Sequence, residues 1–562
     1  MNIEIRQRES HTTARPAKAE TWWHGAVIYQ VYPRSFFDSS GDGIGDLPGI
    51  TAHLDHIAEL GVDAVWISPF FRSPMKDFGY DVTDHCDIDP IFGTLSDFDA
   101  LTARAHQLGL RVIVDQVWSH TADDHPWFAD SRASRDSEKS DWYVWADARP
   151  DGTPPNNWLS VFGGVAWTWE PRRRQYYLHH FLTSQPQLNL YHPDVEKALF
   201  DIGKFWIDRG VDGFRLDAVD FMFHDRRLRD NPARLPTGVI PIRPFGMQRH
   251  VNDMLQPDMF AFMTRLNTFL RDYPDVMTLA EVSSEPGAYR RCAEYTDRRA
   301  HRLDMAYSLA LMKEALTAER LTRVLTEMHD AITHGCVCWA FSNHDVVRAV
   351  SRWGHPEQHH RIALVLVALL VTLPGASCLY QGEELGLTEA SLAHADMRDP
   401  YGINFYPAFV GRDGARTPMP WQADARFAGF TTSQAPWLPV PPEHAERAVD
   451  VQTGDPNSLL HAHRRLLHWR RHHPALRNGG FRLMDLPEPL FGFQRHVNDA
   501  AGGETLIAVF NLHATPTRLP RDLLPARAQI SDLSDFPVET NPESFVLPPY
   551  GAVFAHLDAI PS

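Results

Sequence analysis

Hydrophobic and polar positions along most of this chain follow two alternating patterns. Short apolar runs with the length of buried strands begin near residues 27, 64, 111, 212, 277, 305, 338 and 377. Amphipathic segments lie between most of them, and their spacing predicts helices over Ile50 to Leu60 and over 95–108, 194–209, 258–272 and 360–373. Strands that alternate with helices indicate βα units and a parallel sheet. Eight such strands predict an α/β fold, a (β/α)8 TIM barrel whose active residues lie at the C-terminal ends of the strands.

Two segments depart from this pattern. Residues 121–195 follow the third strand, are rich in Trp, Pro, Asn and Tyr, and contain no βα repeat, which predicts an inserted domain. From residue 481 onward, short strand-like runs such as Thr505 to Phe510 lie between turn residues, which predicts a C-terminal antiparallel β domain. The predicted organisation is a flexible N-terminus at 1–20, the barrel at 21–120 and 196–480, the inserted domain at 121–195 and the β domain at 481–562.

Composition and charge argue against several classes of protein. The chain has 562 residues, which is more than one ordinary core supports, and 43% of them are hydrophobic, as in globular proteins. A formal net charge of −17 argues against binding to nucleic acid or to anionic membranes. The longest apolar run, Ile362 to Pro374, is too short to cross a bilayer. Five cysteines without a C-x-x-C pair, and no secretory signal, predict a cytoplasmic protein. The expected assembly, which the sequence does not determine, is a monomer or a homodimer.

A loop rich in Asp and Gly follows the first strand, which we expect over Val27 to Phe36. Oxygen-bearing side chains recur through residues 38–46, and glycines between them permit a tight turn. Hard cations such as Ca²⁺ and Mg²⁺ prefer oxygen ligands of this kind. The loop begins like an EF-hand but lacks the Glu at its twelfth position. We predict a structural Ca²⁺ or Mg²⁺ site, with a plain Asp/Gly turn as the alternative, and the candidate ligands are Asp38, Ser40, Asp42, Ile44 and Asp46.

The strand that leads to Asp217 ends in charged residues. Because strand side chains alternate, Phe214 and Leu216 should lie on one face, and Arg215 and Asp217 on the other. The Arg would keep the neighbouring Asp ionised, and an ionised Asp can act as a nucleophile or stabilise a cation. A lone pair of this kind is more often a structural salt bridge.

Two further carboxylates favour a catalytic role for Asp217 over a structural salt bridge. Asp217, Glu281 and Asp345 end the fourth, fifth and seventh predicted strands. The C-terminal ends of barrel strands meet at one mouth, so the three carboxylates should converge there. Converging carboxylates repel one another, and their pKa values must separate. Paired carboxylates of this kind are the groups that glycoside hydrolysis uses, one as a nucleophile and one as an acid and then a base.

Four ordered motifs carry a resemblance to a known family. They are Asp-Gln-Val-Trp-Ser-His at 115–120, Gly-Phe-Arg-Leu-Asp at 213–217, Thr-Leu-Ala-Glu at 278–281 and Phe-Ser-Asn-His-Asp at 341–345. The chain resembles glycoside hydrolase family 13, the α-amylase family, and within it the bacterial exo-acting α-glucosidases and oligo-1,6-glucosidases. The resemblance implies a barrel with an inserted domain after strand three and a C-terminal β domain. It also implies that Asp217 is the nucleophile, Glu281 the general acid/base and Asp345 a third carboxylate that helps to distort the sugar.

The same resemblance implies a set of sugar-binding residues. Asp77 and Arg412 would pair across the end of the pocket and make the enzyme exo-acting, with a rim salt bridge as the alternative. Two phenylalanines of the inserted domain would form an apolar wall, although core packing explains either one alone. The predicted substrate-binding residues are Asp77, Tyr80, His120, Phe162, Phe181, Arg215, His344 and Arg412.

Three residues depart from the family pattern. Ser119 replaces the Asn that binds calcium in amylases, which argues against an amylase-type calcium site. Gln187 stands where oligo-1,6-glucosidases often have Asp. Ala218 follows the predicted nucleophile, where a bulky Val accompanies α-1,6 activity and a smaller residue accompanies α-1,4 activity. Ala218 therefore favours α-1,4 linkages.

The prediction is therefore a retaining, exo-acting α-glucosidase that works by double displacement without a catalytic cofactor. Its partners would be small α-glucoside substrates and acceptor alcohols or sugars, to which it could transfer α-glucose. An oligo-1,6-glucosidase, or an isomerase that acts on sucrose or trehalose, is the alternative on the same scaffold. A non-catalytic relative, such as a transporter subunit, is the rival from a different class, but such proteins lose carboxylates that this chain retains.

Overall fold

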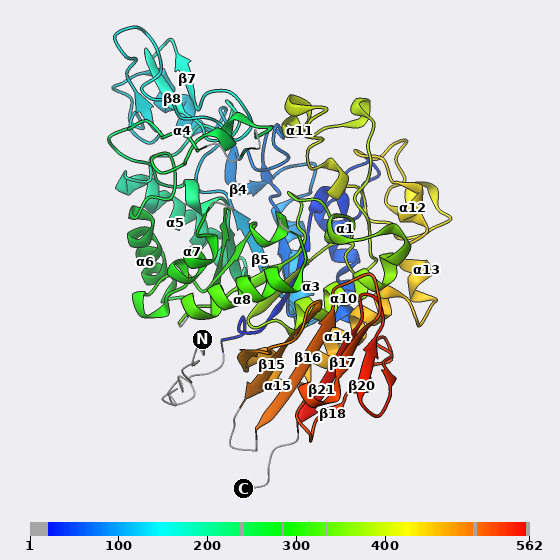
Figure 1. Cartoon of the computed structure of the whole chain (residues 1–562). Coiled ribbons are helices and arrows are strands. Elements are labelled where there is room, and N and C mark those ends of the chain that lie inside the picture. The colour runs from blue at the N-terminus through cyan, green and yellow to red at the C-terminus, as the bar shows by residue number, and fades with distance from the viewer. Residues whose placement is uncertain are drawn as a thin grey trace, which may run out of the picture.

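The computed structural model describes residues 21–235, 238, 241–283, 286–313, 315–332, 334–497 and 503–557. The N-terminus at 1–20, which we predict to be flexible, lies outside these residues. Figure 1 shows a central barrel, a lobe in cyan that rises from one end of it, and a β domain in orange and red on the opposite side.

Eight parallel strands form the barrel, as the apolar runs predicted. Their order in the sheet is β11-β10-β9-β5-β2-β1-β13-β12, and a parallel bridge between Ala306 and Val337 joins its two ends. The sheet therefore closes on itself, and the strand ends gather at one mouth. The strands are β1 (Val27–Val31), β2 (Ala64–Ile67), β5 (Arg111–Gln116), β9 (Gly213–Leu216), β10 (Met277–Val282), β11 (Met305–Ser308), β12 (Cys338–Ala340) and β13 (Ala376–Tyr380).

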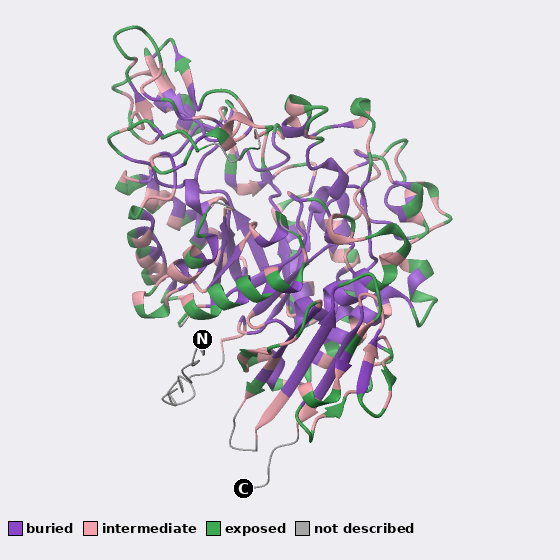
Figure 2. Ribbon diagram, in the orientation of Figure 1, coloured by how far each residue is buried: buried purple, intermediate pink, exposed green. Residues whose placement is uncertain are grey.

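Helices cover the outside of the barrel. In Figure 2 their outer faces are green where they meet solvent, and the strands inside are purple. The helix α10 is buried along most of its length because the barrel and α14 pack against it. The helices are α1 (Leu47–Ala52), α2 (Leu54–Leu60), α3 (Leu95–Gln107), α4 (Pro126–Ala133), α5 (Pro193–Ile207), α6 (Asp258–Leu270), α7 (Ala288–Tyr295), α8 (Ala318–Ala331), α9 (Ala349–Trp353), α10 (His359–Thr372), α11 (Pro400–Phe405), α12 (Pro442–Ala445), α13 (Val449–Thr453), α14 (Leu459–Arg471) and α15 (Pro474–Asn478).

Two predicted elements were wrong in their extent. The first strand ends at Val31 rather than Phe36, because Pro33 lacks the backbone N–H that a barrel strand needs and begins a short 3₁₀ turn. The helix predicted over Ile50 to Leu60 is two helices, since His53 leaves the helical region between α1 and α2 with φ −115° and ψ 12°.

Residues between β5 and α5 form the lobe. Its sheet has the order β6-β8-β7, with β6 at Trp145–Ala146, β7 at Trp167–Glu170 and β8 at Gln175–Leu178. A separate two-stranded ribbon, β3 (Phe71–Arg72) with β4 (Asp84–Ile88), lies in the loop after β2. Buried tryptophans at 158 and 167 stack in the core of the lobe, 5.8 Å apart between ring centroids. The lobe is therefore packed around its own apolar cluster.

The C-terminal part contains two antiparallel sheets. One has the order β14-β15-β16-β21-β18 and the other the order β17-β20-β19. The strands are β14 (Gly480–Leu483), β15 (Leu490–Val497), β16 (Glu504–Asn511), β17 (Thr517–Pro520), β18 (Gln529–Ile530), β19 (Glu539–Thr540), β20 (Ser544–Leu547) and β21 (Ala552–Leu557). The predicted C-terminal antiparallel β domain is thus present.

Alternating side chains give the barrel an outer and an inner core. Phe214 and Leu216 pack outward in the large apolar cluster under the helices. A second cluster lines the interior, with Ile28, Ile113 and Met277 among its members. The predicted alternation therefore holds in β9, and it turns Arg215 toward the inside of the barrel.

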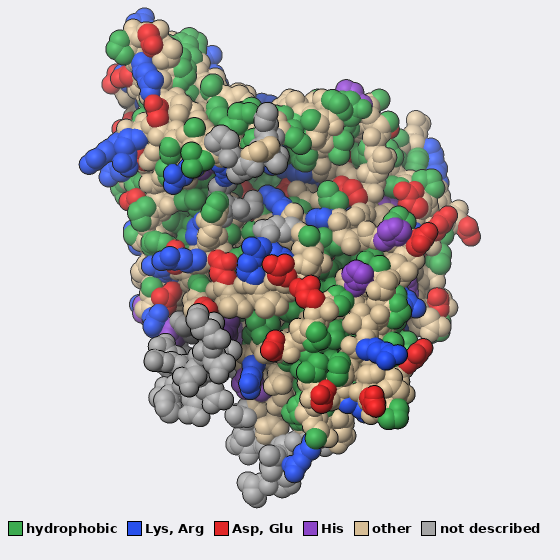
Figure 3. Space-filling model, viewed as in Figure 1, with side chains coloured by type: hydrophobic (Ala, Val, Ile, Leu, Met, Phe, Trp, Pro, Cys, Tyr) green, Lys and Arg blue, Asp and Glu red, His purple; other side chains and the backbone are tan. Residues whose placement is uncertain are grey.

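The surface carries charges of both signs. On the face in Figure 3, acidic and basic side chains are interspersed, without one continuous basic surface. No helix within the described ranges has the length and apolar character needed to cross a membrane.

Candidate active site

The three predicted catalytic carboxylates line one cavity at the mouth of the barrel. Asp217 directly follows β9, Glu281 lies near the end of β10, and Asp345 lies just beyond β12. The cavity has a volume of about 1030 Å³, and all three side chains face it. Asp217 and Glu281 are 8% and 7% exposed, so each carboxylate is largely removed from water but still reaches the cavity.

Arg215 ties two of these carboxylates together. Its Nη1 lies 2.6 Å from Oδ1 of Asp217, and its Nη2 lies 2.7 Å from Oε2 of Glu281. Nη1 also lies 2.8 Å from Asp115, and Nη2 donates to the hydroxyl of Tyr307 at 2.8 Å. The guanidinium group is completely buried, so this network fixes its orientation.

Burial has the largest effect on the pKa values of Asp217 and Glu281. It raises the pKa of Asp217 to about 7, while Arg215 opposes the rise and the charge of Asp115 adds to it. It also raises the pKa of Glu281 to about 7, again opposed by Arg215. A carboxyl group with such a pKa can hold a proton near neutrality and release it, as a general acid and base must.

Asp345 has the opposite electrostatic environment. Burial alone would raise its pKa, but neighbouring groups, among them the guanidinium groups of Arg412 and Arg416, hold the pKa well below its usual value. Nη1 of Arg412 lies 3.0 Å from Oδ1 of Asp345, and Nη2 of Arg416 lies 2.9 Å from the same atom. Asp345 is therefore ionised wherever the protein is folded near neutral pH.

Asp77 and Arg412 form the predicted ion pair. Their closest atoms, Oδ1 and Nη2, are 3.0 Å apart. Asp399, at the start of α11, holds the same guanidinium group, with Oδ1 2.8 Å from Nη2 and Oδ2 3.1 Å from Nε. The side-chain amide of Gln185 donates to Asp77 at 3.0 Å. Segments from three parts of the chain thus hold the pair against the cavity wall.

The predicted histidines are buried and neutral. Burial lowers the pKa of His120 to about 4 and that of His344 to about 3. The ring of His344 lies between those of Tyr32 and Tyr80, with centroid distances of 5.6 and 5.2 Å. The Tyr80 hydroxyl lies 2.7 Å from Nε2 of His344. Tyr80 and His120 reach the cavity, whereas His344 lies behind Tyr80 and supports it.

Phe162 and Phe181 come from the lobe, and both line the cavity. Their ring centroids are 5.9 Å apart. Phe162 also packs under the Arg412 guanidinium group at 5.2 Å, and Phe181 packs against His120 at 5.3 Å. The two rings form a continuous apolar surface from the ion pair toward the strand ends.

Several site residues were missed from the sequence. Asp115 and Tyr307 bind Arg215, while Arg416 and Asp399 hold Asp345 and Arg412. Asp115 begins the 115–120 motif and Arg416 lies four residues after Arg412, so each carried a local signal. Tyr307 carried none, because Arg215 lies 92 residues away in the sequence. Asp399 lies 13 residues before Arg412, in a polar loop whose residues follow no pattern.

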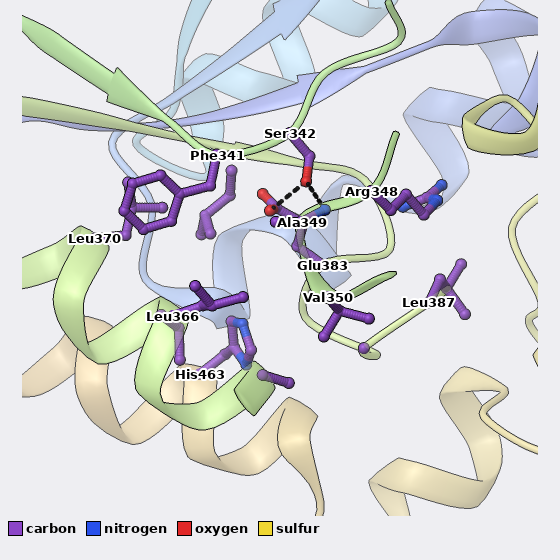
Figure 4. Close-up of a pocket in the computed structure, with 14 residues that line it drawn as sticks. Phe341, Ser342, Arg348, Ala349, Val350, Leu366, Leu370, Glu383, Leu387 and His463 are labelled. Atoms are coloured by element: carbon purple, nitrogen blue, oxygen red, sulfur yellow. Dashed lines mark hydrogen bonds between the residues drawn. The ribbon is translucent and has the colours of Figure 1, made fainter. Parts of the chain in front are cut away.

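Hydrogen bonds outside the large cavity hold the segment that carries Asp345. The hydroxyl of Ser342 donates to Glu383 at 2.8 Å and accepts from the backbone N–H of Ala349 at 2.9 Å. Figure 4 shows these contacts beside a small cavity between β12, α9 and α10. Its volume of about 30 Å³ suits a single water molecule and is far too small for a sugar. These contacts position the loop rather than bind substrate.

The loop at 38–46 has a well-defined fold. Asp38 accepts the backbone N–H groups of Gly41 and Gly43, both at 2.7 Å, and Asp46 accepts the N–H of Ser39 at 3.0 Å. Asp42 accepts only the N–H of Ile44, at 2.8 Å. No cluster of three or more His, Cys, Asp or Glu side chains within the described ranges has the arrangement of a metal site. The oxygen-only set still suits a hard cation chemically, so the cation remains a prediction.

Comparison with known proteins agrees with this site. A family model described as the alpha amylase catalytic domain matches residues 30–479. The chain is 50% identical over 550 residues to a probable alpha-glucosidase of Rhizobium meliloti (strain 1021), which covers 95% of this chain and 97% of that protein. It is 35% identical over 538 residues to an oligo-1,6-glucosidase of Parageobacillus thermoglucosidasius, covering 90% and 93%.

Solved structures give the same relationship. A crystal structure of an alpha-glucosyl transfer enzyme, XgtA, superimposes with a TM-score of 0.91 at 50% identity and covers 95% of this chain and 99% of that one. The trehalulose synthase MutB of Pseudomonas mesoacidophila MX-45 superimposes with a TM-score of 0.84 at 32% identity, covering 96% and 100%. Family model, relatives and structures agree, and the chain belongs to the α-amylase family of glycoside hydrolases, family 13.

Proposed function

We propose that this protein is a retaining, exo-acting α-glucosidase that removes the non-reducing α-glucose from short α-glucosides. The ion pair of Asp77 and Arg412 carries the exo-acting part of this proposal. It lies in the wall of the cavity that also contains the three carboxylates, and Asp399 holds it in place. A buried pair that is braced in this way leaves no room for a further sugar beyond the first glucose.

The proposed reaction is a double displacement. Asp217 attacks the anomeric carbon, and protonated Glu281 gives its proton to the leaving oxygen as the glycosidic bond breaks. The resulting β-glucosyl ester is then attacked by water, whose proton returns to Glu281, and α-glucose leaves. Asp345, which its two arginines keep ionised, stabilises the positive charge that develops on the sugar ring.

Retention of configuration is supported by Arg215. A single guanidinium group contacts both Asp217 and Glu281, which keeps the two carboxylates close together. Retaining glycosidases place their two carboxyl groups about 5–5.5 Å apart, whereas inverting ones leave about 6.5–9.5 Å for a water molecule. The shared guanidinium favours the shorter spacing.

The linkage preference rests on Ala218. This residue follows the proposed nucleophile, lines the cavity, and donates its backbone N–H to Glu281 at 3.2 Å. Its small side chain favours α-1,4 linkages, and the rival is an oligo-1,6-glucosidase. The similarity to an alpha-glucosyl transfer enzyme supports transfer of glucose to an acceptor hydroxyl as a second outcome. The similarity to a trehalulose synthase keeps sucrose isomerisation as an alternative.

A proton NMR time course with maltose tests the proposal. We expect α-glucose to appear before its β anomer, and new α-glucoside signals to report transfer. Release of β-glucose first would contradict retention. If maltose stays intact while isomaltose is cleaved or sucrose is rearranged, the α-1,4 assignment is wrong.

We also propose a cytoplasmic location and a structural cation in the 38–46 loop. All five cysteines are free, and four of them are buried, which is compatible with a reducing compartment. A cation would be held by Asp38, Asp42 and Asp46, with Ser40 and the Ile44 backbone carbonyl as further oxygen ligands. Cell fractionation tests the location, and recovery of the protein in an extracellular fraction would contradict it.

A further inference from the structure

Acidic side chains in the active-site cavity already have cationic partners. Asp77 pairs with Arg412, and Arg215 lies within 2.7 Å of both Asp217 and Glu281. Asp345 contacts two arginines, and Asp220 lies 3.6 Å from the guanidinium group of Arg291. Each acid that lines the cavity is therefore already in contact with a cation other than Arg243.

Arg243 differs from the arginines named above, because it has no carboxylate partner among the described residues. It lies in the long loop between β9 and α6, lines the cavity and is half-buried. Its guanidinium group lies over the rings of Tyr401 and Phe409, at 5.0 and 5.4 Å from their centroids. No carboxylate or carbonyl within the described ranges accepts a hydrogen bond from it, and burial lowers its pKa without an opposing partner charge. The two rings hold a guanidinium fork that has five N–H donors and no acceptor.

The cavity that Arg243 lines also contains exposed apolar side chains. Ile242 is 60% exposed and Val347 is 42% exposed, and both line the cavity. Pro241 and Phe245 line it in the same loop. Exposed apolar side chains beside a cavity mark a surface that a ligand covers. A ligand at this place would meet apolar side chains and the Arg243 guanidinium group, which has no carboxylate partner among the described residues.

We propose that Arg243 is a specificity-determining residue that binds an anionic group on the aglycone or acceptor, and that this group is a carboxylate on a compact apolar body. The inference rests on the proposed function, because it names the leaving group and acceptor of the same site. A planar carboxylate matches the guanidinium fork with two parallel hydrogen bonds. The apolar body covers Ile242 and Val347.

The chemistry at the glucose remains the one proposed above. In hydrolysis, the bond from the anomeric carbon to the aglycone oxygen breaks, and that oxygen takes the proton of Glu281. In transfer, the acceptor hydroxyl gives its proton to Glu281 as its oxygen bonds to the anomeric carbon, and the ester bond between that carbon and Asp217 breaks and frees the carboxylate. The carboxylate at Arg243 forms no covalent bond in either step.

Two isosteric substrates test the role of Arg243. In para-carboxyphenyl α-glucoside the aglycone carries a carboxylate, and in para-carbamoylphenyl α-glucoside a neutral amide of the same shape replaces it. We expect the wild-type enzyme to prefer the carboxylate by about tenfold in kcat/KM, as a charge-assisted pair of hydrogen bonds allows. In R243Q this preference should fall to about one, because a neutral amide replaces the cation. High salt should weaken the wild-type preference by screening the charges.

R226Q is the matched control. Arg226 lies in the same loop and stacks on a tyrosine at 4.9 Å, but it is exposed and does not line the cavity. R226Q should keep the preference of the wild type. Equal kcat/KM for both glucosides in the wild type, or an undiminished preference in R243Q, would overturn the inference alone. Failure of the wild type to cleave maltose and both aryl glucosides would overturn the proposed function and the inference together.

Discussion

At the scale of single residues, Arg215 determines where the two reacting carboxylates lie. Three carboxylates surround its one positive charge, so the network as a whole is negative. Burial in this negative environment raises the pKa of both Asp217 and Glu281. Asp345 escapes that effect because its neighbours, including Arg412 and Arg416 in direct contact with its carboxylate, lower its pKa instead. Burial and the charges around each carboxylate together set its pKa.

Removal of the nucleophile tests this assignment. We expect Asp217→Asn to lower kcat with an aryl α-glucoside by about 10⁴-fold, because the amide cannot form the glycosyl ester. The fold should survive, since Asn keeps the shape of the side chain. Asp230→Asn, at an exposed position of the same loop, is the matched control and should retain full activity. A rate near that of the wild type in Asp217→Asn would disprove the role of nucleophile.

The raised pKa values predict a narrow pH dependence. As the pH falls below about 7, Asp217 takes up a proton and can no longer attack. As the pH rises above about 7, Glu281 loses the proton that the leaving group needs. We therefore expect kcat/KM to peak near pH 7 and to fall on both sides, which a pH series with maltose measures. A plateau that extends far to either side of neutrality would contradict it.

Ala218 predicts the linkage that the enzyme accepts. Its backbone has φ +44°, in the left-handed region where a β-branched side chain is strained. We expect Ala218→Val to shift the ratio of kcat/KM for maltose and isomaltose toward isomaltose by about tenfold, since the larger side chain reshapes the cavity beside the nucleophile. The melting temperature should also fall. Ala218→Gly relieves the strain without added bulk and should keep the preference of the wild type.

At the scale of elements, many functional residues lie in the loops that follow the barrel strands, and the strands fix the positions at which these loops begin. The loop at 38–46 follows the first barrel strand, and its acidic side chains hydrogen-bond to the backbone of the loop itself. Asp42 has the fewest such bonds and is exposed to solvent. Of the three carboxylates, Asp42 is therefore the one that contributes least to the hydrogen bonds of the loop, and its oxygen atoms are the most available to a cation.

A chelator tests the cation proposed for this loop. We expect EDTA to lower the melting temperature by several degrees and Ca²⁺ or Mg²⁺ to restore it, because a bound ion stabilises the folded state. Asp42→Asn should remove the effect of EDTA, and Asp424→Asn, at an exposed position elsewhere, should preserve it. Melting curves that do not change with EDTA or with either cation would show the loop to be a plain turn.

At the scale of the whole molecule, the C-terminal sheet is bound to the barrel through a buried arginine. Arg495 in β15 donates through Nη1 to the carbonyl oxygens of Thr372 and Leu373, both at 2.9 Å. These carbonyls lie at the C-terminal end of α10, where helical hydrogen bonds run out. The β domain thus supplies donors to the end of α10 that the barrel leaves unsatisfied. Within the barrel, Arg470 in α14 donates to the carbonyls of Gly25 and Gly375, which lie just before β1 and β13.

Truncation of Arg495 should therefore affect stability and not catalysis. We expect Arg495→Ala to lower the free energy of unfolding by roughly 2–4 kcal/mol, because buried carbonyl groups lose their donors. Thermal unfolding measures the loss, and kcat at room temperature should stay that of the wild type. Arg482→Ala, on the exposed face of β14, is the matched control and should leave both quantities unchanged. An unaffected melting temperature in Arg495→Ala would show that the contact contributes nothing.

The sequence by itself determined the barrel and the three carboxylates. The period and the length of the apolar runs specify each strand and each helix locally. Eight strands that alternate with helices then predict one arrangement, a closed barrel. Asp217, Glu281 and Asp345 follow directly, because a residue at the C-terminal end of a parallel strand has only one edge of the sheet to occupy. The ends of the first strand and of the helix near His53 were harder to predict, since one proline or one dihedral angle moves them.

Only the tertiary structure decided which further residues hold the predicted pairs. Asp115 and Tyr307 reach Arg215 from about a hundred residues away on either side, and Arg416 reaches Asp345 from 71 residues away. The barrel brings Asp115 on β5, Arg215 on β9 and Tyr307 on β11 together inside it, and pairing between distant strands leaves no local pattern in the sequence. The same reason applies to Arg243. That no described residue accepts a hydrogen bond from its guanidinium group can be seen only when all the neighbouring segments are in place.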